Sequence, residues 1–123
     1  MEFNSKYTNA QIENMLDSIS NTLPEVFYNK QIEHGTSDTT FTLTPNVLHV
    51  WGTVTSLKLT FGNSQDGAIN EYLFQFTSGS TATSLTISDA IKWANDSAPT
   101  IAKNKIYQIS VINGLATVLE FNA

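Results

Sequence analysis

The sequence contains no cysteine, and this absence limits the chemistry that the chain can perform. Without thiols there can be neither a disulfide framework nor a thiolate metal site, so the core must be made by burying apolar side chains. A chain of 123 residues is long enough for one domain with such a core. The lack of cysteine also fits synthesis in a reducing cytosol.

Charged residues are also scarce, at 14% of the chain, and the formal net charge is −5. Only 6 lysine and arginine residues are present, too few for a basic stripe that neutralises phosphates, so no nucleic-acid partner is expected. No apolar run approaches the length of a membrane span, and the first residues lack the basic and apolar regions of a secretory leader. We therefore expect no membrane insertion.

The residues that are abundant point to a folded β protein. The hydrophobic fraction of 41% and the aromatic fraction of 11% are too high for a disordered chain. Because charges are few, threonine, serine and asparagine must supply most of the polar surface. Threonine suits strands because its branched side chain packs well on a pleated, half-buried surface.

Residues from Tyr7 to Asn21 are predicted to form a helix. Thr8 can act as the N-cap, and Gln11 three residues later completes a capping box. The residue before Pro24 is restricted to extended conformations, so the helix should end before it. Apolar side chains recur at helical spacing along one face: Ile12, Met15, Leu16 and Ile19.

This apolar stripe needs a partner, because a helix of about a dozen residues is marginal in water by itself. The partner can be the β domain of the same chain or the stripes of other copies in a short parallel bundle. The stripe covers less than about two heptads, so the coiled-coil signal is weak. The pattern alone leaves both partners open.

From Thr39 onward, short runs of alternating apolar and polar residues predict about seven to nine strands. Gly52 lies inside one of these runs and predicts a bulge or a close backbone approach. The clearest runs cover residues 40–44, 47–53, 56–61 and 70–77, with shorter apolar pieces near 85–87 and 91–94.

The most secure predicted element is a hairpin over residues 104–121, in which Asn113 and Gly114 supply the positive φ angles of a type I′ turn. No helix of crossover length separates the strands, which argues against an α/β fold. We therefore expect a mainly β fold, a β-sandwich of jelly-roll or related type, over residues 39–123. Residues 1–24 are predicted to be a helical anchor and residues 25–38 a connector. No internal repeat is evident.

No catalytic constellation appears in the sequence. No serine lies in a nucleophile elbow, and His34 and His49 lack the spacing of a zinc site. His49 sits on an alternating strand, so a surface or interface position is expected for it. The acids of the predicted strands and loops show no spacing that would pair two of them for glycoside hydrolysis: Glu71, Asp89, Asp96 and Glu120. We expect no enzyme, no metal and no cofactor.

The two tryptophans, Trp51 and Trp93, have two interpretations. If exposed, their rings would form a platform on which sugars stack, so both are candidates for glycan contact. If buried, they belong to the core, the commoner place for aromatic residues that alternate with polar ones on strands.

Several phrases of the sequence resemble bacteriophage and prophage fibre-like proteins of gut bacteria. The segment KYTNAQIENMLD resembles one near the N-termini of those proteins, which reads Tyr-Thr/Ser-Gly-x-x-Ile-Asp-x-Leu-Leu-Asp, with Asn9 here in place of the glycine. Four later phrases resemble their C-terminal β module: LTPNVLHVWGTVTSLKLTFG, NEYLFQFTSG, IKWAND and NKIYQISVINGLA. Together these phrases cover nearly the whole chain.

The resemblance implies a virion structural protein, a head fibre, tail fibre or capsid-decorating protein, assembled in the cytoplasm of the bacterial host. Such proteins are usually homotrimers whose N-terminal helices bundle on the three-fold axis, which would give the stripe Ile12, Met15, Leu16 and Ile19 its partner. Other virion proteins and bacterial surface glycans are the further partners that it implies. The alternatives are a monomeric carbohydrate-binding module and a glycan-processing tail component.

Overall fold

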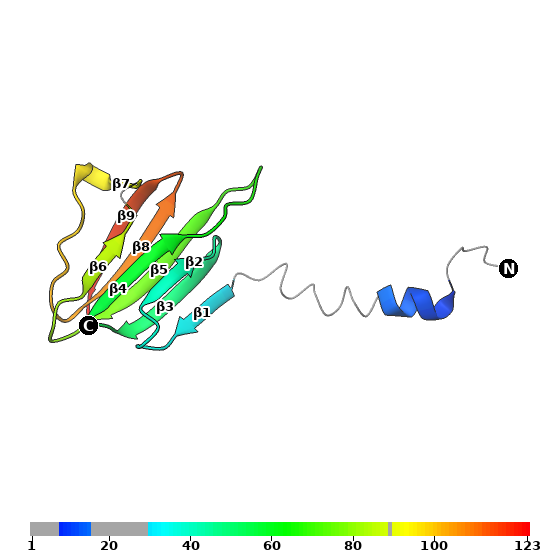
Figure 1. Ribbon diagram of the computed structural model, residues 1–123, viewed down its shortest axis with the longest axis horizontal. Coiled ribbons are helices and arrows are strands. Elements are labelled where there is room, and N and C mark those ends of the chain that lie inside the picture. Colours follow the sequence, from blue (N-terminus) through cyan, green and yellow to red (C-terminus); the bar gives the residue numbers. More distant parts are fainter. Residues whose placement is uncertain (1–7, 16–29, 89) are drawn as a thin grey trace.

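The computed structural model describes residues 8–15, 30–88 and 90–123 of the chain (Figure 1). Within these ranges, residues 9–15 are helical, and the rest forms nine strands and one 3₁₀ turn, η1 (Ala94–Asp96). The prediction of a mainly β protein with a short N-terminal helix is therefore confirmed. The strands are β1 (Lys30–His34), β2 (Thr40–Leu43), β3 (Val47–Thr53), β4 (Ser56–Phe61), β5 (Glu71–Ser78), β6 (Ser84–Ile87), β7 (Lys92–Trp93), β8 (Lys105–Ile112) and β9 (Leu115–Asn122).

The first six strands alternate between two sheets, so the chain winds as a coil. The large sheet has the order β1-β3-β5-β8-β9-β7, and the small sheet has the order β2-β4-β6. The pairs β1–β3, β3–β5, β2–β4 and β4–β6 are all parallel. The hairpin β8–β9 then continues the large sheet in antiparallel pairing beside β5. In Figure 1 the small sheet lies in front of the large one.

This pairing contradicts the jelly-roll prediction, because a jelly roll is built from antiparallel strands. The prediction assumed that parallel strands need helical crossovers. Here each crossover between two strands of one sheet contains a strand of the other sheet. The large sheet also begins at Lys30, inside the range predicted to be a connector, so the β domain starts before residue 39.

The core lies between the two sheets and is one continuous cluster of buried residues. The small sheet contributes the inward side chains of alternate positions, such as Leu57 and Leu59, each 1% exposed. The large sheet contributes mostly aromatic rings from its central strands, and the rings of Phe76 and Tyr107 stack with centroids 5.4 Å apart. This packing explains the alternation in the sequence: on strands β3, β4, β5 and β8, every second side chain is buried.

Local signals in the sequence are confirmed at the turns and at the helix start. Asn113 and Gly114 have φ angles of 52° and 75°, as the type I′ turn requires. The register between β3 and β5 shifts between Val50 and Thr53, a stretch that includes Gly52, in agreement with the predicted irregularity. At the helix, the backbone N–H of Thr8 donates to the Gln11 side chain over 2.8 Å, and the Gln11 N–H donates to Thr8 Oγ1 over 3.2 Å, a capping box.

Candidate interaction surfaces

The helix presents apolar side chains that the described chain leaves exposed. Ile12 is half-buried, and Met15 is 46% exposed. The other two members of the predicted stripe, Leu16 and Ile19, lie outside the described residues. The described part of the helix therefore has apolar side chains that are accessible to a partner.

The outer face of the large sheet, the side turned away from the core, is also apolar. Leu115, Leu119 and Phe121 alternate on β9 with residues that point toward the core, and they are 59%, 59% and 47% exposed. In the sheet register they continue into apolar residues of the neighbouring strands. The apolar members of this face are Leu48, Val50, Leu73, Ile106, Ile112, Leu115, Leu119 and Phe121.

Polar groups in the middle of this face are paired with one another. Gln108 Nε2 donates to Gln75 Oε1 over 2.8 Å, and Ser110 Oγ donates to Glu71 Oε2 over 2.6 Å. A shallow depression of about 210 Å³ beside these pairs has Leu48, Leu73 and Leu119 among its walls. Because these four polar side chains are paired with one another, removing them from water costs less than it would if they were unpaired.

The outer face of the small sheet has the opposite character. Its outward positions carry hydroxyl side chains around a single charge, Lys58, and Thr42 Oγ1 lies 2.8 Å from Thr60 Oγ1 on the neighbouring strand. These positions are Thr40, Thr42, Ser56, Lys58, Thr60, Ser84 and Thr86, all exposed. The two faces of the molecule thus differ: one carries exposed apolar side chains among polar ones, and the other is a hydroxyl-covered surface suited to water.

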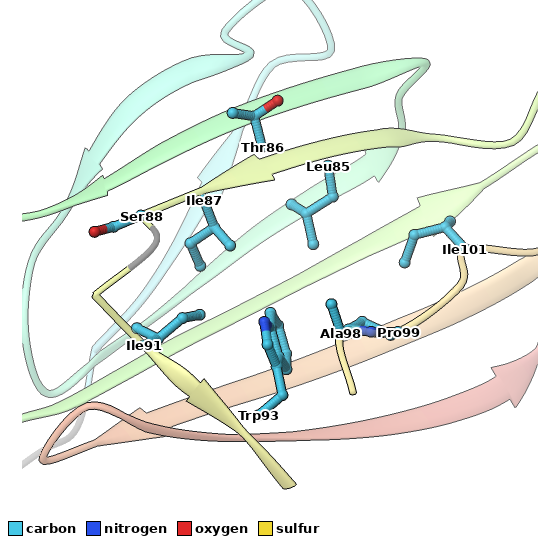
Figure 2. Close-up of a pocket in the computed structure, with 9 residues that line it drawn as sticks. All are labelled: Leu85, Thr86, Ile87, Ser88, Ile91, Trp93, Ala98, Pro99 and Ile101. Carbon is cyan, nitrogen blue, oxygen red and sulfur yellow. The ribbon is translucent and has the colours of Figure 1, made fainter. Parts of the chain in front are cut away.

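A groove opens between β6 and the loop that follows it, at the end of the small sheet (Figure 2). It encloses about 610 Å³, and Trp93 stands in it opposite Leu85 and Ile87 of β6. Its other walls are Ile91, Ala98, Pro99 and Ile101, with Thr86 and Ser88 at the edge. Trp93, one of the two predicted glycan contacts, therefore lines a groove and is half-exposed.

Trp51, the other predicted glycan contact, is only 1% exposed and cannot stack on a sugar. Its ring stacks on His34 with centroids 4.2 Å apart and an interplanar angle of 13°. Its indole N–H donates to the backbone carbonyl of Asp38. This part of the prediction is corrected: Trp51 fastens β1 and the turn after it to β3.

The two histidines, which no spacing motif paired, form a hydrogen-bonded chain next to Trp51. His34 Nδ1 lies 3.0 Å from Asp38 Oδ2, and His34 Nε2 lies 2.9 Å from His49 Nδ1. His49 Nε2 lies 3.0 Å from the backbone N of Thr44. His49 is 0% exposed, which corrects the expectation of a surface or interface histidine. One signal was present: in the alternation, His49 shares a strand face with Trp51.

Burial of His49 is expected to make the stability of the fold depend on pH. Burial disfavours the imidazolium and lowers the pKa of His49; a hydrogen bond to the Thr44 backbone opposes this, and the charge of His34 adds to it. As the pH falls through the ordinary histidine pKa of about 6.5, the unfolded chain takes up a proton that the folded chain resists. Stability is therefore full above that pH and decreases below it.

We expect the free energy of unfolding to fall between about pH 7 and pH 5, by at most about 1.4 kcal/mol per pH unit for one proton. In His49→Gln the free energy should be lower at neutral pH, but its dependence on pH should be flatter. Urea unfolding of both proteins at several pH values measures this difference. Equal slopes in the two proteins would show that His49 does not carry the pH dependence.

Other chemistry finds no support among the described residues. They contain no group of three histidine or acidic side chains that could hold a metal ion. None of the described residues that line the groove is a carboxylate. The helical residues in the described ranges are too few and too polar to cross a membrane.

Comparison of the chain with protein-family models, with curated proteins and with solved structures finds no match. The function must therefore be argued from the helix stripe, the two sheet faces and the groove.

Proposed function

We propose that this chain is a structural protein of a bacteriophage virion, a homotrimeric head-fibre, tail-fibre or capsid-decoration protein. The observation that carries the proposal is the apolar outer face of the large sheet, on which Leu115 and Leu119 are each 59% exposed in the single chain. Large exposed apolar patches mark interaction sites on folded proteins. The resemblance of several segments to fibre-like proteins suggests the partner, which is further copies of the same chain.

In this trimer the outer face of the large sheet turns toward the three-fold axis and the hydroxyl face turns toward solvent. The contrast between the two faces supports this orientation, because burying the apolar face removes it from water and leaves the threonine-rich face hydrated. The helix extends the same contact through Ile12 and Met15, and by sequence through Leu16 and Ile19. Packing of three such stripes would give a short helix the partner that it needs.

The role of such a protein is assembly and presentation rather than catalysis. Its partners would be other virion proteins, and its place would be the virion, assembled in the bacterial cytoplasm. Of the two predicted glycan contacts, only Trp93 is accessible, because Trp51 is buried. Three copies on one axis would convert weak single-site binding into avidity.

Light scattering of the full chain tests the trimer, because one chain has a mass of 13.5 kDa. A mass of about three chains that persists on dilution is the expected result. A stable mass of one chain would contradict the proposal and favour the monomeric carbohydrate-binding module. A glycan-processing component would instead require two carboxylates facing each other across a groove.

Substitution of the helix stripe by Ile12→Asp and Met15→Asp should weaken the trimer, because carboxylates would replace apolar contacts near the axis. We expect dissociation to begin at protein concentrations about tenfold or more above those of the parent protein. Glu13→Gln with Asn14→Asp, at exposed positions of the same helical turn, is the matched control and should leave the mass unchanged. A stripe variant that dissociates no more readily than this control would show that the helix does not contribute.

A further inference from the structure

The small sheet ends earlier than the large sheet that it covers. It has three strands and ends at β6, whereas the large sheet has six and continues through β8 and β9. The segment that contains β7 and η1 covers this end only in part and leaves the Trp93 groove, of about 610 Å³, beside β6 (Figure 2). The groove therefore occupies the place that a fourth strand of the small sheet would take.

The free edge of β6 has backbone groups available for such a strand. In parallel pairing, alternate residues direct both backbone groups toward the same neighbour. Ser84 N donates to Thr55 O over 2.9 Å, so Ser84 and Thr86 face β4, and the N–H and C=O groups of Leu85 and Ile87 face the open edge. Among the backbone hydrogen bonds between described residues, none reaches Leu85 or Ile87 from residues 90–101.

The side chains of these same two residues form one wall of the groove. Leu85 and Ile87 point toward Trp93, and Ile101 lies at the other end of the groove (Figure 2). The described walls carry no charge, and the nearby ion pair of Lys92 and Asp96, with nitrogen and oxygen 3.8 Å apart, is exposed to solvent. The site thus combines mostly apolar side chains with backbone donors and acceptors of Leu85 and Ile87 that no other described backbone group bonds.

We propose that the groove binds an extended segment of another polypeptide, which adds to the small sheet as a strand beside β6. The backbone of the segment would pair with Leu85 and Ile87, and every second side chain, apolar, would insert beside Trp93. The intervening side chains would lie next to Thr86 on the hydroxyl face and should be polar. Only a polypeptide offers donors and acceptors at strand spacing together with side chains of alternating character.

A glycan fits the same groove less well. Sugar recognition needs several polar side chains around an exposed aromatic ring, and the described walls supply only Thr86 and Ser88. Strand addition needs neither trimer formation nor virion attachment, so the test of this inference is independent of the test of the proposed function.

A peptide with the sequence of β4, SLKLTF, blocked at both ends, is a suitable probe because it alternates as the groove requires and already pairs with the other edge of β6. Titration into the ¹⁵N-labelled full chain should shift the amide resonances of β6 and of residues 90–101. Shifts confined to the edge strands β1 or β2, or no shifts, would overturn the proposal. A soluble oligosaccharide, maltohexaose, should cause no shifts; shifts at Trp93 with maltohexaose but not with the peptide would assign the groove to glycans instead.

N-methylation of the probe tests backbone pairing without altering the protein. One peptide is methylated at the amides of the residues that correspond to Leu57 and Leu59, and the other at those of Lys58 and Thr60. Only one set of amides can face β6, so one peptide should lose affinity by about tenfold or more while the other binds normally. If the peptide methylated at Lys58 and Thr60 loses affinity, the strand adds in parallel. If the peptide methylated at Leu57 and Leu59 loses affinity, the strand adds in antiparallel orientation. Equal affinity of both peptides would exclude a strand.

Substitution of the groove provides an independent check. Trp93→Ala should weaken binding of the unmethylated probe by about tenfold, because one apolar wall is removed. Thr40→Ala, on the β2 edge of the same sheet, is the matched control and should leave the affinity unchanged. Equal loss in the two variants, or no loss in Trp93→Ala, would show that the probe binds elsewhere.

Discussion

Replacing both Leu119 and Phe121 by lysine is expected to reduce the molar mass in solution from about three chains to one, 13.5 kDa. Both residues lie on the outer face of the large sheet and are 59% and 47% exposed in the single chain. In a trimer closed by this face, each copy would bury two ammonium groups without a partner, at a cost of about several kcal/mol per ion. The apolar area that these side chains contribute would be lost as well.

The matched control places the same charges on the opposite side of the molecule. Thr60→Lys with Thr86→Lys adds two lysines to the hydroxyl face, which remains in solvent in the proposed trimer. Its mass should stay that of the parent protein. Circular dichroism of both variants checks that the strands are intact. A β9 variant that keeps the mass of the parent protein would reject this face as the contact between copies.

The second large effect is expected from Trp51→Ala, which should lower the free energy of unfolding by about 3–5 kcal/mol. The substitution removes a side chain that is 1% exposed, its stacking on His34 and its hydrogen bond to the Asp38 carbonyl. Because those contacts join β1 to the rest of the large sheet, amide hydrogen exchange should increase most strongly in β1. Chemical unfolding and hydrogen exchange measure the two effects.

Trp93→Ala is the internal comparison for this experiment. Trp93 is half-exposed in a groove, so its removal should lower the free energy of unfolding by about 1–2 kcal/mol, less than half of the effect at Trp51. If the two substitutions cost the same, the distinction between a core tryptophan and a groove tryptophan would be wrong.

The strands and turns could be predicted because they depend on local signals. Alternating residues marked most of the strands, and Asn113 and Gly114 marked the final turn. The pairing of the strands could not be predicted, because strands that pair in one sheet are separated in the sequence by a strand of the other sheet. Lys30 pairs with Val47, 17 residues later, whereas Val47 pairs with Tyr72, 25 residues later. Because successive coils differ in length, the sequence has no fixed period by which a repeat could be recognised.

The candidate surfaces were predictable to different extents for the same physical reason. Trp51 and Trp93 both appear in strand-like patterns, yet one is covered by His34 and the other borders a groove. That difference arises because the small sheet has only three strands, and no local sequence pattern predicts this number. Leu73 falls at a polar-phase position of β5, whereas the outward phase of β9 is the more apolar of its two, so only the register shows that Leu73 and Leu119 share the outer face.

The strand order also determines when the fold can be completed during synthesis. β5 is the last strand of the coil in the large sheet, and its second neighbour, β8, belongs to the C-terminal hairpin. Until that hairpin leaves the ribosome, one edge of β5 has no partner, although the earlier coils have already been made. We infer that the nascent chain carries an open sheet edge until the β8–β9 hairpin has emerged, so the large sheet can be completed only once that hairpin is available.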